Sequence, residues 1–329
     1  MVSVIIPARN EIFLQQTIDN LLENATGEIE IIAGLDGYWP NPPIRDDKRV
    51  HLLHFSTVQG MRNNINAMVR ISKGEYIMKC DAHCAFAPGF DEVLVRDCVE
   101  RNWIMIPRRY SLDVEGWGIE DNGKVRDSHY LSYPTAFPDN TYLGFGMHVK
   151  DWYGRGMERA EHMIDEDMTF QGSCWFMHKE YYTPMNEVGY GPFIQEAQEL
   201  GLKIQLSGGK IMTNKNTWYA HLWKGKRFGR MYDLSRQESK IGEIYSADFW
   251  YNNRWDKRIH DFEWLIDKFW PIPTWPENWK DLVIDFPKVI VQVPEVNAKS
   301  DDAESPRTEK VMNRRSSESH IEEVWDQQD

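Results

Sequence analysis

An aspartate and a histidine two residues apart, Asp81 and His83, follow directly after a short apolar run from Tyr76 to Cys80. Residues i and i+2 at the end of a strand point to the same side, so a carboxylate and an imidazole can reach one point in space. That pair of ligands favours Mn²⁺ or a similar divalent ion over Mg²⁺ alone. A strand-end turn with two solvated polar side chains is the alternative interpretation of this short pattern.

The segments around this pair alternate between expected strands and helices. The β-branched run from Val2 to Ile6 predicts a strand buried on both faces, as in a parallel sheet covered by helices. Apolar residues at helical spacing predict a helix from Leu14 to Leu22. Further strands are expected at 28–33, 50–55, 76–80 and 103–107, and helices after Gln59-Gly60 and at 90–101. This order predicts an α/β fold of Rossmann type, with a mostly parallel central sheet flanked by helices.

Polar residues fall just after several of the predicted strands. Arg9 and Glu11 follow the first strand, Asp36 follows the second, and Asp81 follows the fourth. Sheets of this type bind their ligands at the carboxyl ends of the strands. The four side chains are therefore expected on one rim, and their convergence is better evidence for a site than any one of them.

The second half of the chain is less regular. From about 108 to 167 no clear periodicity is visible, and long stretches of this kind inside a compact domain are usually functional or mobile. Order is expected to resume at 168–176, with a helix at 193–200 and strands at 203–206 and 210–213. Residues 231–295 are rich in Trp and Pro, which predicts a helical and loop extension packed on the preceding domain. The polar composition of 296–329 predicts a disordered tail.

Composition sets further bounds on the class of protein. The chain has 329 residues and a formal net charge of −13, which argues against a general polyanion binder, because phosphate contacts need clustered Lys and Arg. Its four cysteines show no zinc-ribbon or disulfide spacing, so reduced thiols are expected. No signal peptide and no apolar run of roughly 18 residues is visible. We therefore expect a soluble cytoplasmic protein, without a membrane span, or a domain of a longer chain.

Several motifs resemble, in the same order, those of GT-A fold, family-2-like glycosyltransferases. The opening Ser3-Val-Ile-Ile-Pro7-Ala-Arg9-Asn-Glu11 is similar to their N-terminus, and Asp36 and Gly60-Met-Arg62 follow in the expected order. Asp81-Ala-His83 resembles their D-x-D element, and in particular the Asp-Ser-His of polypeptide N-acetylgalactosaminyltransferases. The resemblance covers roughly residues 2–230. It implies a GT-A domain at 1–230, with a nucleotide-sugar-binding half at 1–107 and an acceptor half at 108–230.

Two later segments extend the resemblance into the second half. Gln195-Glu196 resembles the helix start that carries the acceptor-side carboxylate, although the family reads Glu-Asp or Gly-Gly-Glu there. Tyr219-Ala-His221-Leu-Trp223 resembles the segment whose histidine is the third metal ligand. The resemblance thus implies that Asp81, His83 and His221 hold Mn²⁺ or Mg²⁺. It also implies that Glu196 is the catalytic carboxylate, with Glu199 as the competing candidate.

The nucleotide-sugar site is likewise implied by the resemblance. Asp36 would accept a hydrogen bond from the uracil N3–H, and the basic loop after His221 would clamp the diphosphate. The full set of expected donor-binding residues is Pro7, Arg9, Glu11, Asp36, Gly60, Arg62, Asp81, Lys224 and Arg227. Each has a structural alternative: a turn aspartate, a helix-start glutamate, helix capping or a solvated basic loop. Trp175, Trp218 and Trp223 are stacking candidates for sugar or base, with core packing as the alternative.

The function implied is a metal-dependent glycosyltransferase that moves a sugar from a nucleotide-sugar, UDP-sugars first, to an acceptor hydroxyl. The acceptor is either a glycan or polypeptide, or a 5-hydroxymethyl pyrimidine in DNA, because compact family-2-like enzymes also occur in bacteriophages. A phage enzyme would work in the host cytoplasm. The alternatives are a GT-A-like nucleotidyltransferase, whose Gly-rich phosphate loop is missing after Ile6, and a non-catalytic nucleotide-sugar-binding protein. No protein partner is predicted.

Overall fold

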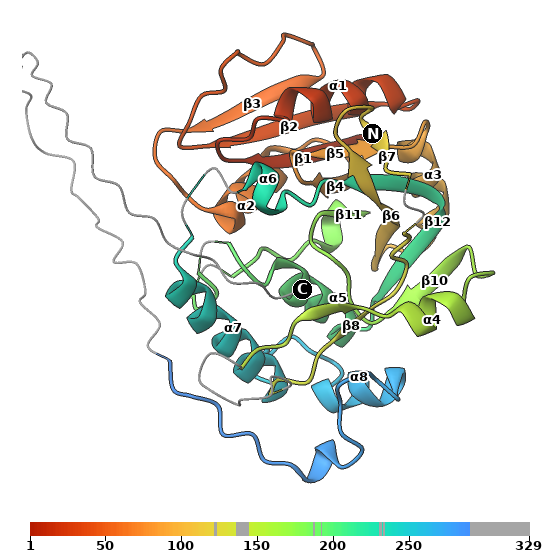
Figure 1. Cartoon of the computed structure of the whole chain (residues 1–329), viewed down its shortest axis with the longest axis vertical. Helices are drawn as coiled ribbons and strands as arrows, with labels where there is room; N and C mark the ends of the chain where they lie inside the picture. Colours follow the sequence, from red (N-terminus) through yellow and green to blue (C-terminus); the bar gives the residue numbers. More distant parts are fainter. Residues whose placement is uncertain are drawn as a thin grey trace, which may run out of the picture. The chain divides into compact units, whose positions relative to one another are not determined.

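A large β-sheet forms the centre of the protein (Figure 1). The computed structural model describes residues 1–121, 124–135, 145–186, 188–191, 193–229, 232 and 234–289. The strands of the sheet lie in the order β10-β12-β6-β11-β4-β1-β2-β3. Their bounds are β1 Val2–Ala8, β2 Ile29–Asp36, β3 Val50–Phe55, β4 Tyr76–Cys80, β6 Trp103–Asp113, β10 Ile164–Asp167, β11 Cys174–His178 and β12 Lys210–His221.

Helices cover both faces of the parallel half of the sheet, β3-β2-β1-β4. The side chains of β1 alternate between faces, so Val4 and Ile6 pack with helix α1 (Leu14–Asn24), whereas Ile5 packs with helix α2 (Met61–Ile71). A third helix, α3 (Phe90–Asp97), joins the α1 side through Phe90 and Leu94. This burial on both faces explains the wholly apolar strands and confirms the α/β class predicted from them.

A glycine fixes the position of α2 against the sheet. Asn64 of α2 donates a hydrogen bond to the carbonyl of Gly34 at 2.8 Å. A Cβ at position 34 would lie 1.8 Å from Asn64 Oδ1, so a larger residue in β2 would push the helix away. The close approach sets the start of α2 beside the carboxyl end of β2.

The second half of the sheet departs from the predicted elements in several places. The strand predicted at 203–206 is wrong, because helix α5 runs without a break from Glu196 to Leu206. All residues of α5 are buried, the polar ones included, so its polar and apolar residues do not separate into an exposed and a buried face, and the amphipathic period that predicts a helix is weak. The stretch predicted as irregular at 108–167 contains the end of β6 and further short elements: β7 Gly118–Ile119, β8 His129–Leu131, β9 Val149–Asp151, α4 Tyr153–Glu158 and β10.

The described part of the Trp-rich segment is made of helices and loops. Its helices are α7 Arg236–Tyr251 and α8 Phe262–Phe269, and the short helix α6 (Gly225–Phe228) precedes the segment. Trp250, Trp275 and Trp279 share a hydrophobic cluster with Tyr130 and Leu131, and Trp275 Nε1 donates to the Leu131 carbonyl at 2.8 Å. Residues 1–293 group into one compact unit. The predicted tail at 296–329 lies outside the described residues, and the domain boundaries at 107, 230 and 295 stay predictions.

Among the helices of the described residues, none combines the length and apolar character needed to cross a membrane.

Candidate active site

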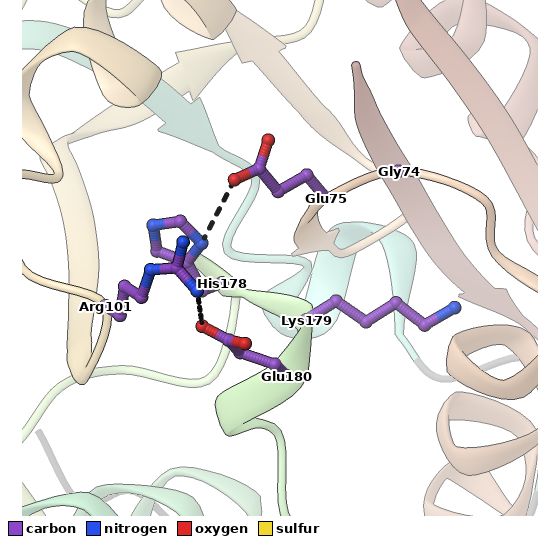
Figure 2. A pocket seen from close by; sticks show the side chains of 6 residues that line it. All are labelled: Gly74, Glu75, Arg101, His178, Lys179 and Glu180. Atoms are coloured by element: carbon purple, nitrogen blue, oxygen red, sulfur yellow. Dashed lines mark hydrogen bonds and ion pairs between the residues drawn. The ribbon is translucent and has the colours of Figure 1, made fainter.

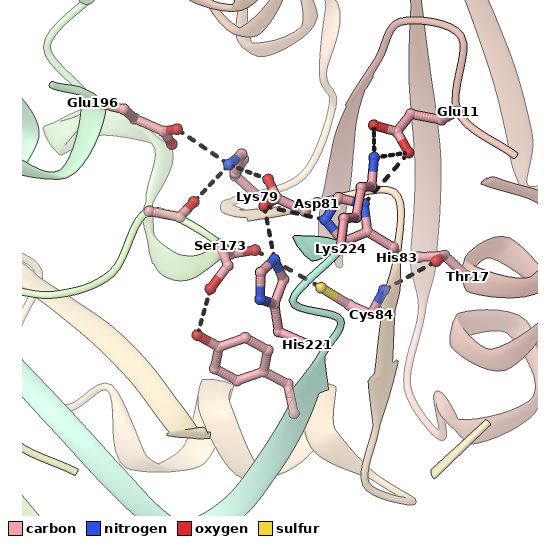
Figure 3. A network of polar contacts seen from close by, with 12 residues as sticks. Glu11, Thr17, Lys79, Asp81, His83, Cys84, Ser173, Glu196, His221 and Lys224 are labelled. Atoms are coloured by element: carbon pink, nitrogen blue, oxygen red, sulfur yellow. Dashed lines mark hydrogen bonds and ion pairs between the residues drawn. The ribbon is translucent and has the colours of Figure 1, made fainter. Parts of the chain in front are cut away.

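Two strand ends bring Asp81, His83 and His221 together (Figure 3). Asp81 follows β4 directly, and the turn through His83 leads into the short strand β5 (Cys84–Phe86). That strand pairs with the end of β12, with His221 opposite Cys84. His221 Nε2 lies 3.2 Å from Asp81 Oδ2, and His83 Nε2 lies 3.9 Å from the same oxygen. One ligand atom from each residue lies within 4.8 Å of the others.

The protonation states of this cluster suit a divalent cation. Burial is the main reason why the pKa of His221 falls to about 4, so its imidazole is neutral at neutral pH. Burial would raise the pKa of the Asp81 carboxyl, but the charge of Lys79 and the contact with His221 hold it well below its usual range. Metal ions bind neutral imidazoles and ionised carboxylates. Two imidazoles and one carboxylate therefore fit a cation such as Mn²⁺, with positions left for ligand oxygens.

A buried lysine connects this cluster to helix α5. Lys79 of β4 places its Nζ 2.7 Å from Asp81 Oδ1, 3.1 Å from Glu196 Oε2 and 2.5 Å from the Gly172 carbonyl. Trp175 Nε1 donates to the other carboxylate oxygen of Glu196 at 2.7 Å. Burial raises the pKa of Glu196 although Lys79 opposes this rise. Glu196 thus lies one ammonium group away from Asp81, at the first residue of α5.

Sequence reasoning missed Lys79, although a signal was present. The residue stands in the middle of an otherwise apolar strand whose positions 77–80 are all buried. A lysine is almost never fully buried unless it is paired, so its place in such a run predicts an acidic partner. The pattern does not say which carboxylate that partner is.

Arg62 and Glu199 pair with each other inside the protein. Arg62 is about 1% exposed and forms an ion pair with Glu199, which is also buried. Its guanidinium donates to the carbonyls of Ile194 and, at 3.2 Å, Asn186. Lys203 Nζ lies 2.6 Å from the other oxygen of Glu199. These buried pairs favour structural roles for Arg62 and Glu199. The expected role of Arg62 toward a diphosphate and that of Glu199 as the competing carboxylate stay predictions.

Asp36, the last residue of β2, contacts the loop that leads from β3 through Gly60 into α2. Asp36 is buried and accepts hydrogen bonds from the backbone N–H groups of Gln59, at 2.6 Å, and Gly60, at 3.1 Å. Gly60 has a φ of 84°, which favours glycine at this turn into α2. Pro7 lies near the end of β1, in register with Gly34 of β2. Asp36 therefore shapes the loop, and its expected contact with a base stays a prediction.

The loop after β1 meets the loop after β12. Lys224 Nζ lies 2.6 Å from both carboxylate oxygens of Glu11, and Glu11 Oε2 lies 3.4 Å from His83 Nδ1. Burial would raise the pKa of Glu11, but His83 and Lys224 lower it, so the group is ionised. The guanidinium of Arg9 lies over the ring of Tyr232, 5.0 Å from its centroid. Arg227 is exposed, with its nearest carboxylate, Glu115, at 3.8 Å.

The three tryptophans expected to stack on ligands differ in exposure. Trp175 is fully buried and bonded to Glu196, so the stacking role expected for it is wrong and packing is its role. Trp218 is half-buried and meets Tyr110 edge to face, with ring centroids 6.3 Å apart. Trp223 is 80% exposed, two residues after His221. Of the three, Trp223 is therefore the one whose face is open to a ligand.

A separate hollow of about 390 Å³ lies at the other end of β4 (Figure 2). It is lined by Gly74, Glu75, Arg101, His178, Lys179 and Glu180. Arg101 and Glu180 are paired at 2.7 Å, and Glu75 and His178 lie 3.9 Å apart. Its charges compensate each other, and it adjoins the amino end of β4, whereas Asp81 follows the carboxyl end. The hollow is therefore not part of the Asp81 cluster.

Comparison with known proteins identifies the fold. Residues 3–162 match the model of glycosyl transferase family 2. A crystal structure of GalNAc-T7 with UDP, GalNAc and Mn²⁺ is similar over 76% of this chain and 48% of its own, with 15% sequence identity and a TM-score of 0.56. The S. aureus TarS 1–349 structure aligns over 68% of this chain and 60% of its own, at 13% identity and a TM-score of 0.42.

This chain therefore spans about half of the GalNAc-T7 chain and less than two thirds of the TarS chain. No curated protein sequence matches it. The match of residues 3–162 and the similarity to GalNAc-T7 confirm the GT-A fold expected from the motifs.

Proposed function

Because residues 3–162 match glycosyl transferase family 2 and the fold is of GT-A type, we propose that this chain is a glycosyltransferase that transfers a sugar from a nucleotide-sugar to an acceptor hydroxyl with the help of a divalent cation. The observation that carries the proposal is the meeting of Asp81, His83 and His221 at the ends of β4 and β12. The similar GalNAc-T7 structure contains UDP and Mn²⁺, which supports a UDP-sugar and Mn²⁺, or Mg²⁺, as the first reagents to test.

In this proposal the cluster of Asp81, His83 and His221 stabilises the leaving group. A divalent cation held by Asp81, His83 and His221 supplies Lewis-acid stabilisation for the negative charge of the departing diphosphate. Lys79 keeps Asp81 ionised and in place, since its ammonium lies 2.7 Å from the carboxylate. The ion pair between Glu11 and Lys224 connects the loop after β1 to the loop after β12, beside the same cluster. Trp223, exposed beside this loop, is available to stack on a sugar or base.

Glu196 is the proposed acceptor-side carboxylate. Its raised pKa favours proton acceptance from an attacking hydroxyl, because a base is more effective when its pKa approaches the working pH. Each of its oxygens already accepts one hydrogen bond, from Trp175 or from Lys79, and retains a second lone pair. The two contacts hold the carboxylate in a fixed orientation relative to Asp81.

A thermal-shift screen tests the donor and the cation together. UDP-, GDP- and CDP-sugars are compared with and without Mn²⁺ and Mg²⁺, because ligands that bind the native state raise its melting temperature. We expect a nucleotide-sugar to stabilise the chain more with the cation than without it, and the same pair to support donor hydrolysis. Stabilisation and turnover by a nucleoside triphosphate alone would favour the nucleotidyltransferase alternative, and stabilisation without turnover the non-catalytic one.

The acceptor is tested with the donor found in that screen. Glycans, peptides and duplex DNA carrying 5-hydroxymethyl pyrimidines are offered in parallel, and transfer is measured as release of the nucleotide. A DNA acceptor would bind with an affinity that falls steeply with salt. All four cysteines are free thiols, which supports placing the activity in a reducing compartment such as the cytoplasm.

A further inference from the structure

One buried cation beside the Asp81 cluster has no partner among the described residues. Arg109 of β6 is 7% exposed, and its Nε makes no hydrogen bond. In the described part of the chain no carboxylate pairs with its guanidinium, and no oxygen accepts a hydrogen bond from it. A buried charge without a counter-charge is costly, so natural proteins keep one where a ligand supplies the missing charge or where function requires it.

The strand register places Arg109 next to the proposed metal ligands. Strands β6 and β12 are parallel, with Arg109 opposite Tyr219 and Ser111 opposite His221. Residues in register point to the same face, so the guanidinium shares a face with the Tyr219 and His221 side chains. Burial raises the pKa of Tyr219 and lowers that of His221, and the nearby charge of Arg109 acts downward on the pKa of both, which agrees with this placement.

Other cations in this region are already paired. Lys79 pairs with Asp81 and Glu196, and Lys224 pairs with Glu11. The preceding residue, Arg108, makes two hydrogen bonds to Asp127, at 3.0 and 2.8 Å. Arg109 is thus available for an incoming anion, whereas its neighbours would first have to give up a protein carboxylate.

Charge balance indicates which anion this is. The three carboxylates of Glu11, Asp81 and Glu196, the two lysines and a bound divalent cation together leave one positive charge in excess. The diphosphate of a nucleotide-sugar brings two negative charges, which turns this into one negative charge in excess. A single guanidinium compensates it, and its fork of donors matches phosphate oxygens.

We propose that Arg109 binds a phosphate oxygen of the nucleotide-sugar diphosphate, next to the cation held by His221. The inference rests on the proposed function and assigns a substrate-binding residue within that site. Arg109 binds the diphosphate in the ground state and keeps its contact as negative charge develops on the leaving group.

Substitution of Arg109 by Met tests this inference. The dissociation constants of UDP, uridine and Mn²⁺ are measured by calorimetry for the wild-type chain and for Arg109→Met. We expect UDP to bind roughly 10- to 100-fold more weakly to the variant, since a charged hydrogen bond is lost. Uridine, which has no phosphate, should bind unchanged. Mn²⁺ without nucleotide should bind as well as before or better, because a positive charge beside His221 has been removed.

Stability separates this role from a structural one. Removal of an unpaired buried charge should leave the melting temperature unchanged or raise it, whereas loss of a structural contact would lower it together with Mn²⁺ binding. Arg109→Lys should retain part of the UDP affinity. The matched control is Arg101→Met, which removes an exposed arginine beside the amino end of β4 and should leave UDP binding unchanged.

The dissociation constant of inorganic pyrophosphate, measured in the same way, is an independent test of the anion site. A wild-type chain that binds UDP no better than Arg109→Met does would overturn the inference and leave the proposed function standing. A wild-type chain that binds pyrophosphate through Arg109 but no nucleotide-sugar would overturn the proposed function and the nucleotide-sugar as the ligand of Arg109, and would leave only a diphosphate site there. A wild-type chain that binds neither anion would overturn both.

Discussion

Two glutamates three residues apart at the start of α5 have different surroundings although both are buried. Glu196 is paired with Lys79, which also holds Asp81, so it belongs to the network around the candidate metal centre. Glu199 is paired with Arg62 and Lys203, which tie α5 to α2 and to its own next turn. Residue type and helical position are nearly the same in both cases. The partner alone separates a carboxylate linked to the site from one that holds the fold together.

Removal of Asp81 should have the largest effect, since both the metal cluster and the Lys79 network depend on it. We expect Asp81→Ala to lower cation-dependent donor hydrolysis on the order of 10³-fold, because Lewis-acid stabilisation contributes several kcal/mol. Hydrolysis is measured as nucleotide release with and without Mn²⁺. The control is Asp256→Ala, at an exposed position in the connection between α7 and α8. Full cation-dependent activity in Asp81→Ala would contradict the metal role.

The two glutamates themselves are compared by conservative substitution. Glu196→Gln should lower sugar transfer about 100-fold with little change in donor binding, because a general base contributes on that scale. Glu199→Gln should instead lower the free energy of unfolding by about 3 kcal/mol, because it leaves buried Arg62 without its counter-charge. Transfer rates of the folded protein and urea unfolding are measured for both. An exchange of the two outcomes would mean that Glu199 is the acceptor-side residue.

A double-mutant cycle tests whether Lys79 affects sugar transfer through its contact with Glu196. Lys79→Met should lower transfer about tenfold by freeing Glu196 from its fixed orientation, and residues in contact are coupled. In Lys79→Met/Glu196→Gln we therefore expect a smaller loss of rate than the product of the two single effects, because only the contact of Lys79 with Asp81 is then left to lose. In Arg62→Met/Glu196→Gln the effects on transfer should simply combine. Additive effects in the Lys79 pair would show that the contact does not position Glu196.

The smallest expected effect concerns a histidine outside both networks. Burial would lower the pKa of His129, but Asp151 and Asp167, 3.4 and 3.3 Å from its ring nitrogens, raise it above its ordinary value. A raised folded-state pKa adds stability below the unfolded pKa, and this contribution is lost as the pH rises through the folded pKa. The melting-temperature difference between wild type and His129→Gln should therefore be larger at pH 6.5 than at pH 9. A constant difference would argue against a charged His129.

Much of the fold could be predicted from local patterns. The wholly apolar runs of β1 and β2 and the helical spacing of α1 depend on neighbours a few residues away, and the structure has them where expected. The strand predicted within α5 failed because a helix that is buried on every side has no exposed polar face, so its polar residues do not follow the helical period. The predicted meeting of Asp81 and His221, 140 residues apart, needed a family motif in addition to local spacing.

The sequence by itself therefore determined the α/β order, the family-2-like motifs and the residue types of a cation site. The tertiary structure decided which charged side chains pair with another protein group and which do not. Lys79 meets Glu196 across 117 positions and Arg62 meets Glu199 across 137. Such pairings follow from how strands and helices are stacked, since a buried charge takes whichever opposite charge the fold brings near it. For the same reason, only the three-dimensional arrangement shows that Arg109 has no partner in the described chain.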